Sequence, residues 1–437
     1  MIAKFGNIRI ASFKLPSLSE SLLLLYLISV ILISMTPGGN LVSKLVGLIL
    51  LYFFVLSVIK SKKKVLISRE IYFAIGWLVI GLISGFVATD INLVYVKVFT
   101  IIQLLIFFIV GYSIINQGAI SIKNIFYVFI ISVVIAFLYG LLTQGNAAVV
   151  VTRNRIVGTA GDPNQIAVFG AFAILFSIYL IIIEKKYFFK LLNIAFIAIL
   201  LLGIIKTQSR QGMLIILVSA IVLLILNYFS EYNKSDNKSR IIIRSSLIFL
   251  SSIVIIGIVV YYFRQSDYYY RVQALITFVK ISLGSTSDNI TKMIDYSAYE
   301  RKKLISFGIK MWLDHPLIGI GLDNFRVVIK DYWPISNRLY SHNNYIELLS
   351  TIGTFGTIVY YSIYYSIFKK LAQVSKKSEY SKNNHNIKLI HIFITAMVCL
   401  MVLELVTVTY YSKFTWILLM IILGYIDKLS YTKQVEE

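Results

Sequence analysis

The chain has 437 residues, of which 58% are hydrophobic and 14% are charged, with a mean hydropathy of +0.81 and a net charge of +22. These values exclude an ordinary soluble domain and are typical of a polytopic membrane protein. The single cysteine, Cys399, excludes disulfide bonds within the chain and cysteine-based metal sites.

Long apolar stretches dominate the sequence. Crossing a bilayer takes about 20 apolar residues, and about twelve stretches of that kind predict an all-α polytopic membrane protein with about 12 transmembrane helices. They begin near Ser21, Asn40, Glu70, Leu93, Asn124, Gln165, Leu191, Gln211, Ser245, Ile346, Leu389 and Phe414. We therefore expect transmembrane helices 1–9 in residues 1–263, one large extracytoplasmic loop in 264–345, and helices 10–12 in 346–437.

Positive charge gathers in alternate loops, at 60–64, 184–190, 231–244 and 369–388. Cytoplasmic loops of membrane proteins carry such an excess of Lys and Arg, so the pattern predicts that these loops and both termini are cytoplasmic. Most of the net charge is then a topology signal that also attracts anionic lipid. It does not indicate a nucleic-acid partner.

Three arginines depart from this rule, because Arg153, Arg155 and Arg210 flank spans on the predicted outer side. Turn-forming residues and amides surround them, and arginine is suited to bidentate contacts with phosphate. Two arginine-bearing loops on one membrane face therefore predict a diphosphate site at the outer leaflet. Snorkelling to lipid headgroups is the preferred interpretation for three lysines, namely Lys44, Lys97 and Lys413.

The segment 155–164 reads as a loop that enters the sixth span. Asn164 is expected to cap the helix that follows, and the positive end of this helix would add backbone N–H donors for an anion. Capping alone is the simpler interpretation, and the two are compatible.

The large insert contains one amphipathic segment, 300–312, with apolar residues at helical spacing among basic ones. We expect a short helix that lies on the membrane or covers a cavity and stops before Pro316. Gly319 and Gly321 lack a third glycine and a strand–helix context, so they indicate a tight turn rather than a dinucleotide site.

Three titratable residues near or within the last spans are candidates for chemistry. His342 lies at the mouth of the tenth span, where it is either a general base or a helix cap. Glu347 is a candidate partner for an arginine. Glu404 lies inside the eleventh span, where a carboxylate is costly, and it is expected to pair with an outer arginine or to contact the acceptor.

Four stretches together resemble the O-antigen ligase and polymerase superfamily of bacterial polysaccharide assembly. They are 155–167 (RIVGTAGDPNQIA), 207–212 (TQSRQG), 312–325 (WLDHPLIGIGLDNF) and 341–347 (SHNNYIE) leading to Gly353 and Gly356. Each stretch alone is weak, whereas their order, spacing and placement on one membrane face are fairly specific. The resemblance covers about residues 150–360.

The resemblance implies a GT-C type membrane glycosyltransferase that needs neither a metal ion nor another cofactor. Such enzymes transfer a glycan from undecaprenyl diphosphate to a sugar hydroxyl outside the bacterial cytoplasmic (inner) membrane. By the resemblance, His342 acts on the acceptor hydroxyl and Arg210 on the leaving group. Further donor- or glycan-binding candidates are Arg153, Arg155, Asn164, Arg338, Asn343, Tyr345 and Glu347.

Two alternatives remain open from the sequence. A ligase attaches a finished glycan to lipid A core or another acceptor, whereas a polymerase joins repeat units of O-antigen or capsular polysaccharide, with a chain-length regulator as an additional partner. The compact length and lack of an extra external domain favour the polymerase. A flippase or exporter is the alternative from another class, but the expected internal repeat is not apparent.

Overall fold

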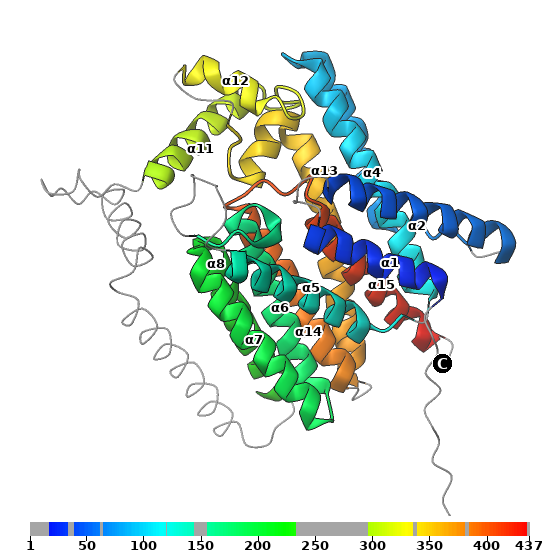
Figure 1. The fold of residues 1–437 in the computed structure, drawn as a ribbon. Helices are drawn as coiled ribbons and strands as arrows, with labels where there is room; N and C mark the ends of the chain where they lie inside the picture. The colour runs from blue at the N-terminus through cyan, green and yellow to red at the C-terminus, as the bar shows by residue number, and fades with distance from the viewer. Residues whose placement is uncertain are drawn as a thin grey trace, which may run out of the picture.

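We describe the protein from a computed structural model, over residues 17–33, 39–61, 64–118, 120–143, 155–232, 296–334, 339–380 and 384–434. Regular structure in these ranges is helical (Figure 1). The first half contains α1 (Leu18–Ile28) with a π-helical extension (Ser29–Ile33), α2 (Gly39–Ser61), α3 (Arg69–Ile83), α4 (Ile91–Gln117), α5 (Ile122–Thr143), α6 (Pro163–Ile183), α7 (Tyr187–Thr207) and α8 (Arg210–Tyr232). The second half contains α11 (Tyr296–Asp314), α12 (Phe325–Tyr332), α13 (Asn344–Tyr380), α14 (Asn384–Glu404) and α15 (Lys413–Gln434).

The all-α polytopic class is confirmed. Within the described ranges, nine helices are long and apolar enough to cross a membrane, so the expected number of about twelve is not reached there. The segment formed by α1 and its extension is shorter than a span, and α15 is not among the nine. The predicted ninth span, near Ser245, lies outside the described residues.

Two groups of helices build the core (Figure 1). In one, the most buried helix, α6, packs against α5, α7, α8 and α14. In the other, α4 packs on α15 and α13 packs on α3, while α13 also contacts α14 and so joins the groups. Stacked aromatic rings fill the first group, as between Phe126 and Phe176, whose centroids are 4.2 Å apart.

Hydrogen bonds between loops support the predicted alternation of the two membrane sides. Loops expected on the outer side bond to one another: Asp90 exchanges two hydrogen bonds with Asn324, and Lys413 donates to Asn40. Loops expected on the inner side do the same, because Gln117 donates to the carbonyl of Lys64. Which side faces the cytoplasm remains a prediction.

The insert is attached to the bundle through a break in α13. Gly353 has a left-handed φ of 69°, which interrupts the helix. Two backbone N–H groups of the turn after α11 fill the gap, since Ile320 donates to Ser350 O and Gly321 to Thr351 O, each at 2.9 Å. Thr354 N in turn donates to Pro316 O at 2.8 Å. The turn thus satisfies backbone groups that a broken membrane helix leaves unpaired.

Two expectations about the insert are confirmed by this arrangement. Helix α11 covers 300–312 and ends at Asp314, directly before the His315–Pro316 pair. Gly319 and Gly321 have φ values of 75° and 100° and form a turn, as expected. The sequence did not reveal the partner of this turn, which lies 30 residues further along the chain.

Glu404 is fully buried at the end of α14 and accepts hydrogen bonds from four hydroxyl groups. The donors are Tyr360 (3.3 Å), Tyr361 (2.8 Å), Tyr364 (2.6 Å) and Thr409 (2.7 Å). The expected arginine partner is therefore replaced by a cage of hydroxyls. Such charge-assisted bonds offset the cost of a carboxylate at membrane depth.

Replacement of Gly353 by alanine tests the joint between α13 and the insert. A methyl group there would clash with Leu317 O, and the left-handed φ disfavours alanine. We expect the free energy of unfolding to fall by about 1–3 kcal/mol, measured by denaturant or thermal unfolding in detergent. Gly76→Ala in α3 is the control, because its methyl group meets only Val359 at 3.8 Å. Equal stability of the two variants would contradict the account.

Candidate functional site

Three helices begin close together on the predicted outer side: α6, α8 and α13. The loop between α14 and α15 connects two of them, because Gln211 at the start of α8 donates to Val406 O and Asn343 before α13 donates to Leu405 O, each at 3.1 Å. These carbonyls are consecutive, so Arg210 and His342, which neighbour the two donors, are brought to the same region. Helix α6 is added through the 155–164 loop.

Arg155 holds that loop against the start of α8. Its Nε donates to Thr207 O at 2.7 Å, and Nη2 donates to Asn164 Oδ1 at 3.2 Å. The same Asn164 oxygen accepts from Ser209 Oγ at 3.0 Å. The two arginine-bearing loops, which were expected to act together, are thus neighbours. The Arg155 side chain is partly exposed.

The expectation that Asn164 caps α6 is wrong. The N-cap is Asp162, whose carboxylate accepts from Asn164 N at 2.8 Å. The reason is Pro163, which takes the first helical position, so that the cap is the residue directly before it, two residues earlier than expected. The side chain of Asn164 is thereby available to join the two arginine-bearing loops.

Arg210 is the first residue of α8 and is partly exposed. A cation at the positive end of a helix is unfavourable unless an anion or partner offsets it. The same end offers backbone N–H groups to an anion. This position is therefore suited to a ligand with more than one negative charge.

His342 occupies a sharp turn directly before α13. Its φ is 54°, an uncommon value for a residue with a side chain, and it is half-buried. Asn343 caps the helix instead, because its Oδ1 accepts from Ile346 N at 3.1 Å. The helix-cap interpretation of His342 is therefore wrong, and its imidazole is not used by the cap.

The pKa of His342 is lowered, first by burial and second by the positive charge of Arg301 on α11, while Asp162 opposes the shift. A lowered pKa favours the neutral imidazole, the form that accepts a proton. His342 and the Arg155 loop both adjoin the start of α8, because Asn343 and Gln211 bond to consecutive carbonyls and Arg155 bonds to Thr207 O.

Three residues near His342 that were expected to touch substrate hold the turn in place. Glu347 is fully buried and accepts from Ser341 N at 2.9 Å, whereas an arginine partner was expected. Tyr345 donates to Met401 O at 3.1 Å. Asn343, besides capping, bonds to the α14–α15 loop as described above. Arg153 and Arg338 lie outside the described residues.

Lys97 was expected to snorkel to lipid, and this expectation is wrong. It is 8% exposed, and its Nζ lies 3.1 Å from Asp323 Oδ1. Asp323 is fully buried and also binds Arg326 at 2.7 Å. The sequence contained one indication of a buried partner, namely that Lys97 lies within the fourth span. The partner itself was not predictable, because Asp323 is 226 residues further along the chain.

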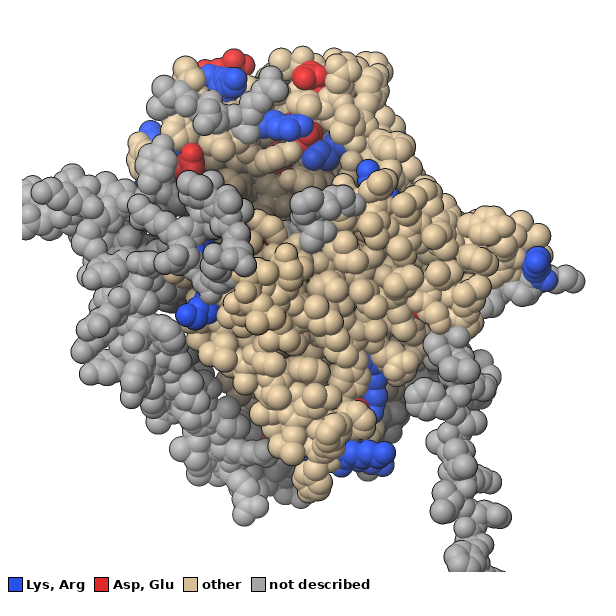
Figure 2. Space-filling view, viewed as in Figure 1, with Lys and Arg blue, Asp and Glu red and all other residues tan. Residues whose placement is uncertain are grey.

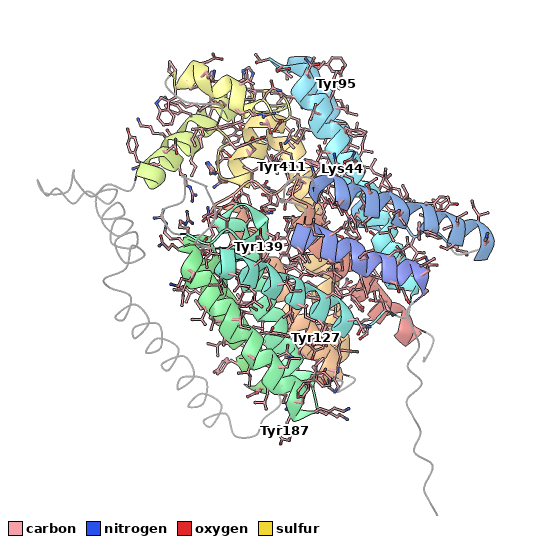
Figure 3. The ribbon with its side chains drawn as sticks, viewed as in Figure 1. Lys44, Tyr95, Tyr127, Tyr139, Tyr187 and Tyr411 are labelled. Carbon is pink, nitrogen blue, oxygen red and sulfur yellow. The ribbon has the colours of Figure 1, made fainter. Side chains whose placement is uncertain are left out.

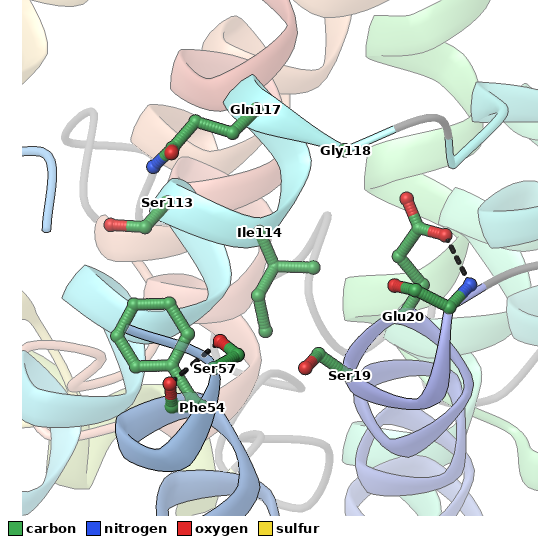
Figure 4. A pocket seen from close by; sticks show the side chains of 9 residues that line it. Ser19, Glu20, Phe54, Ser57, Ser113, Ile114, Gln117 and Gly118 are labelled. Atoms are coloured by element: carbon green, nitrogen blue, oxygen red, sulfur yellow. Dashed lines mark hydrogen bonds between the residues drawn. The ribbon is translucent and has the colours of Figure 1, made fainter. Parts of the chain in front are cut away.

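The molecular surface is hollowed beneath α11 and α12. Figure 2 shows a hollow beneath the α11–α12 part of the molecule, with Lys and Arg side chains at its upper rim. A separate pocket, lined by Glu20, Phe54 and Ile114 among others, lies by the C-terminal end of α4 (Figure 4). Lys97 lies near the other end of that helix, so the pocket is not part of the site.

One comparison with known proteins finds a family that part of the chain resembles. Residues 194–361 match the family model described as O-antigen ligase, and the matched segment contains Arg210, His342 and Glu347. The comparison with curated proteins finds no match. The family match over this segment and the polytopic helical fold both support the resemblance to the O-antigen ligase and polymerase superfamily.

Proposed function

We propose that the protein is a membrane glycosyltransferase that moves a glycan from undecaprenyl diphosphate to a sugar hydroxyl, as a repeat-unit polymerase of O-antigen or capsular polysaccharide. The family match over residues 194–361 supports the coarser function, of ligase or polymerase type. The observation that carries the finer proposal is the meeting of Arg155, Arg210 and His342 where α6, α8 and α13 begin. The expected location is the extracytoplasmic face of a bacterial inner membrane.

The arginines are proposed to bind the diphosphate. Arg155 and Arg210 carry positive charge, and the first turns of α6 and α8 add backbone N–H donors. As the bond between the anomeric carbon and the phosphate oxygen breaks, its electron pair passes to the diphosphate, and these groups stabilise the developing charge. In this scheme the arginines supply the stabilisation without a divalent cation.

His342 is proposed to be the general base. The acceptor hydroxyl oxygen forms a bond to the anomeric carbon, and its proton passes to an imidazole nitrogen of His342. The lowered pKa keeps the imidazole neutral, and therefore able to take that proton, at neutral pH. The buried network of Asn343, Glu347 and Ser341 holds it in this position.

A transfer assay tests the proposal. Purified protein in nanodiscs receives the undecaprenyl-diphosphate-linked repeat unit with EDTA present, and glycan length and released undecaprenyl diphosphate are measured. We expect a ladder of products, and a loss of about 10²–10⁴-fold in rate for His342→Ala and Arg210→Ala. Lys206→Ala is the control, since this exposed lysine lies in the last turn of α7, four residues before Arg210, and its loss should leave the rate unchanged.

Each of the other possible outcomes would indicate a different function or mechanism. A single adduct with a lipid A core acceptor, and no ladder, would establish a ligase. Loss of transfer in EDTA that added Mg²⁺ restores would contradict the metal-independent scheme. Movement of the glycan across vesicles without any joining would establish a flippase. Full activity of His342→Ala would remove the general base.

The pH dependence provides a separate test of His342. Because its pKa is lowered, kcat/KM should fall only when the pH drops below the ordinary range for histidine. Arg301→Gln removes a charge that lowers the pKa, so the acid limb should move to higher pH. Asp162→Asn keeps a capping side chain but removes a charge that raises the pKa, so the limb should move to lower pH.

The control for these shifts is Lys303→Gln on α11, whose ammonium group lies over the rings of Tyr299 and Phe307. This variant should leave the acid limb in place. If Arg301→Gln and Asp162→Asn also keep the wild-type pH profile, His342 is not the group that titrates.

A further inference from the structure

A cluster of tyrosines and charges lies between α4, α12, the chain before His342 and the α14–α15 loop. Lys97 Nζ lies 3.6 Å from the ring centroid of Tyr411 and 5.6 Å from that of Tyr340. The guanidinium carbon of Arg326 is 5.5 Å from the Tyr340 centroid. Four parts of the chain thus meet in one cation–π arrangement.

The buried side of this cluster is rigidly held. Asp323 is fully buried and bonds to both Lys97 and Arg326, at 3.1 and 2.7 Å. The rings of Tyr340 and Tyr411 contact each other with centroids 6.0 Å apart. Their positions are therefore fixed before any ligand binds, which lowers the entropic cost of binding.

The outer side of the cluster remains accessible. Tyr340 and Tyr411 are only partly buried, and the Arg326 side chain is 28% exposed. Figure 3, drawn from the same direction as Figure 2, places Tyr411 at the recess beneath α11 and α12. Tyr340 is two residues before His342, so this aromatic wall adjoins the imidazole.

We propose that Tyr340, Tyr411 and Arg326 form a subsite for a sugar ring of the acceptor glycan. The proposal rests on the transferase function proposed above. Partly exposed tyrosine rings can pack against the C–H face of a sugar, and the partly exposed Arg326 side chain, of which Nη2 is bonded to Asp323, can donate to its oxygens. Asp323 pairs with both cations of the cluster, so the wall is less suited to a diphosphate than the Arg155–Arg210 region.

This arrangement divides the recess between the two substrates. The lipid diphosphate lies on the side of α6 and α8, where Arg155 and Arg210 are. The acceptor sugar lies on the side of α4 and α12, against the tyrosines. His342 is between these sides, because Tyr340 is two residues before it and Asn343, directly after it, bonds to the loop that Gln211 of α8 also contacts.

Acceptor binding and steady-state kinetics test the subsite with full-length protein in nanodiscs. The probe is the repeat-unit oligosaccharide freed from its lipid by mild acid, and its Kd is measured by equilibrium dialysis. We expect Tyr411→Ala and Tyr340→Ala to raise the Kd and the acceptor KM about tenfold or more, with a smaller change in kcat. Tyr411→Phe should retain binding, because it keeps the ring.

Tyr95→Ala is the matched control. This exposed tyrosine lies on α4, as Lys97 does, but apart from the recess (Figure 3). It should bind the oligosaccharide as the wild type does. Unchanged Kd in folded Tyr411→Ala and Tyr340→Ala would overturn the subsite, as would failure of the wild type to bind. Binding without transfer in the wild type would contradict the proposed function, and its loss in these variants would still support the subsite.

Discussion

The position of His342 depends on buried hydrogen bonds at the start of α13. Asn344 is fully buried, and its Oδ1 accepts from the backbone N–H groups of Thr409 and the following residue, at 2.9 and 3.0 Å. Its Nδ2 donates to Tyr361, which in turn donates to Glu404. In a low-dielectric interior an unpaired polar group is costly, so this network has one satisfied arrangement. That arrangement ties the histidine turn to the loop that α8 also contacts.

The break in α13 also fixes the surroundings of the His342 turn, because it attaches the insert to the bundle. The turn at 316–321 can pair with the broken helix only if α11 and α12 lie over the start of α13. Trp312 reinforces the joint by donating to Thr354 Oγ1 at 3.0 Å. The insert is therefore held against α13 through these bonds, and it carries Arg301 on α11 and Arg326 on α12. The left-handed φ values of Gly319 and Gly321 allow the tight turn on which this pairing depends.

Much of the fold followed from local patterns. Apolar length predicted the helices, and Pro316 predicted the end of α11, because both effects act within a few residues. The candidate site was less predictable, since it depends on contacts between distant segments. Nothing near Asn164 indicates Ser209 as its partner, and nothing near Lys97 indicates Asp323. The sequence indicated that Glu404 is an energetically unfavourable carboxylate inside a span. It did not reveal that hydroxyl groups from α13 and Thr409 surround it.

A structure of the protein with undecaprenyl diphosphate bound in nanodiscs, determined by cryo-electron microscopy, tests the central claim most directly. The account predicts diphosphate density at the starts of α6 and α8, in contact with Arg155 and Arg210, on the same side of the membrane as His342. Diphosphate density at the opposite end of α4, beside Glu20 and Ser113, would contradict it. So would a lipid whose phosphates lie away from both arginines.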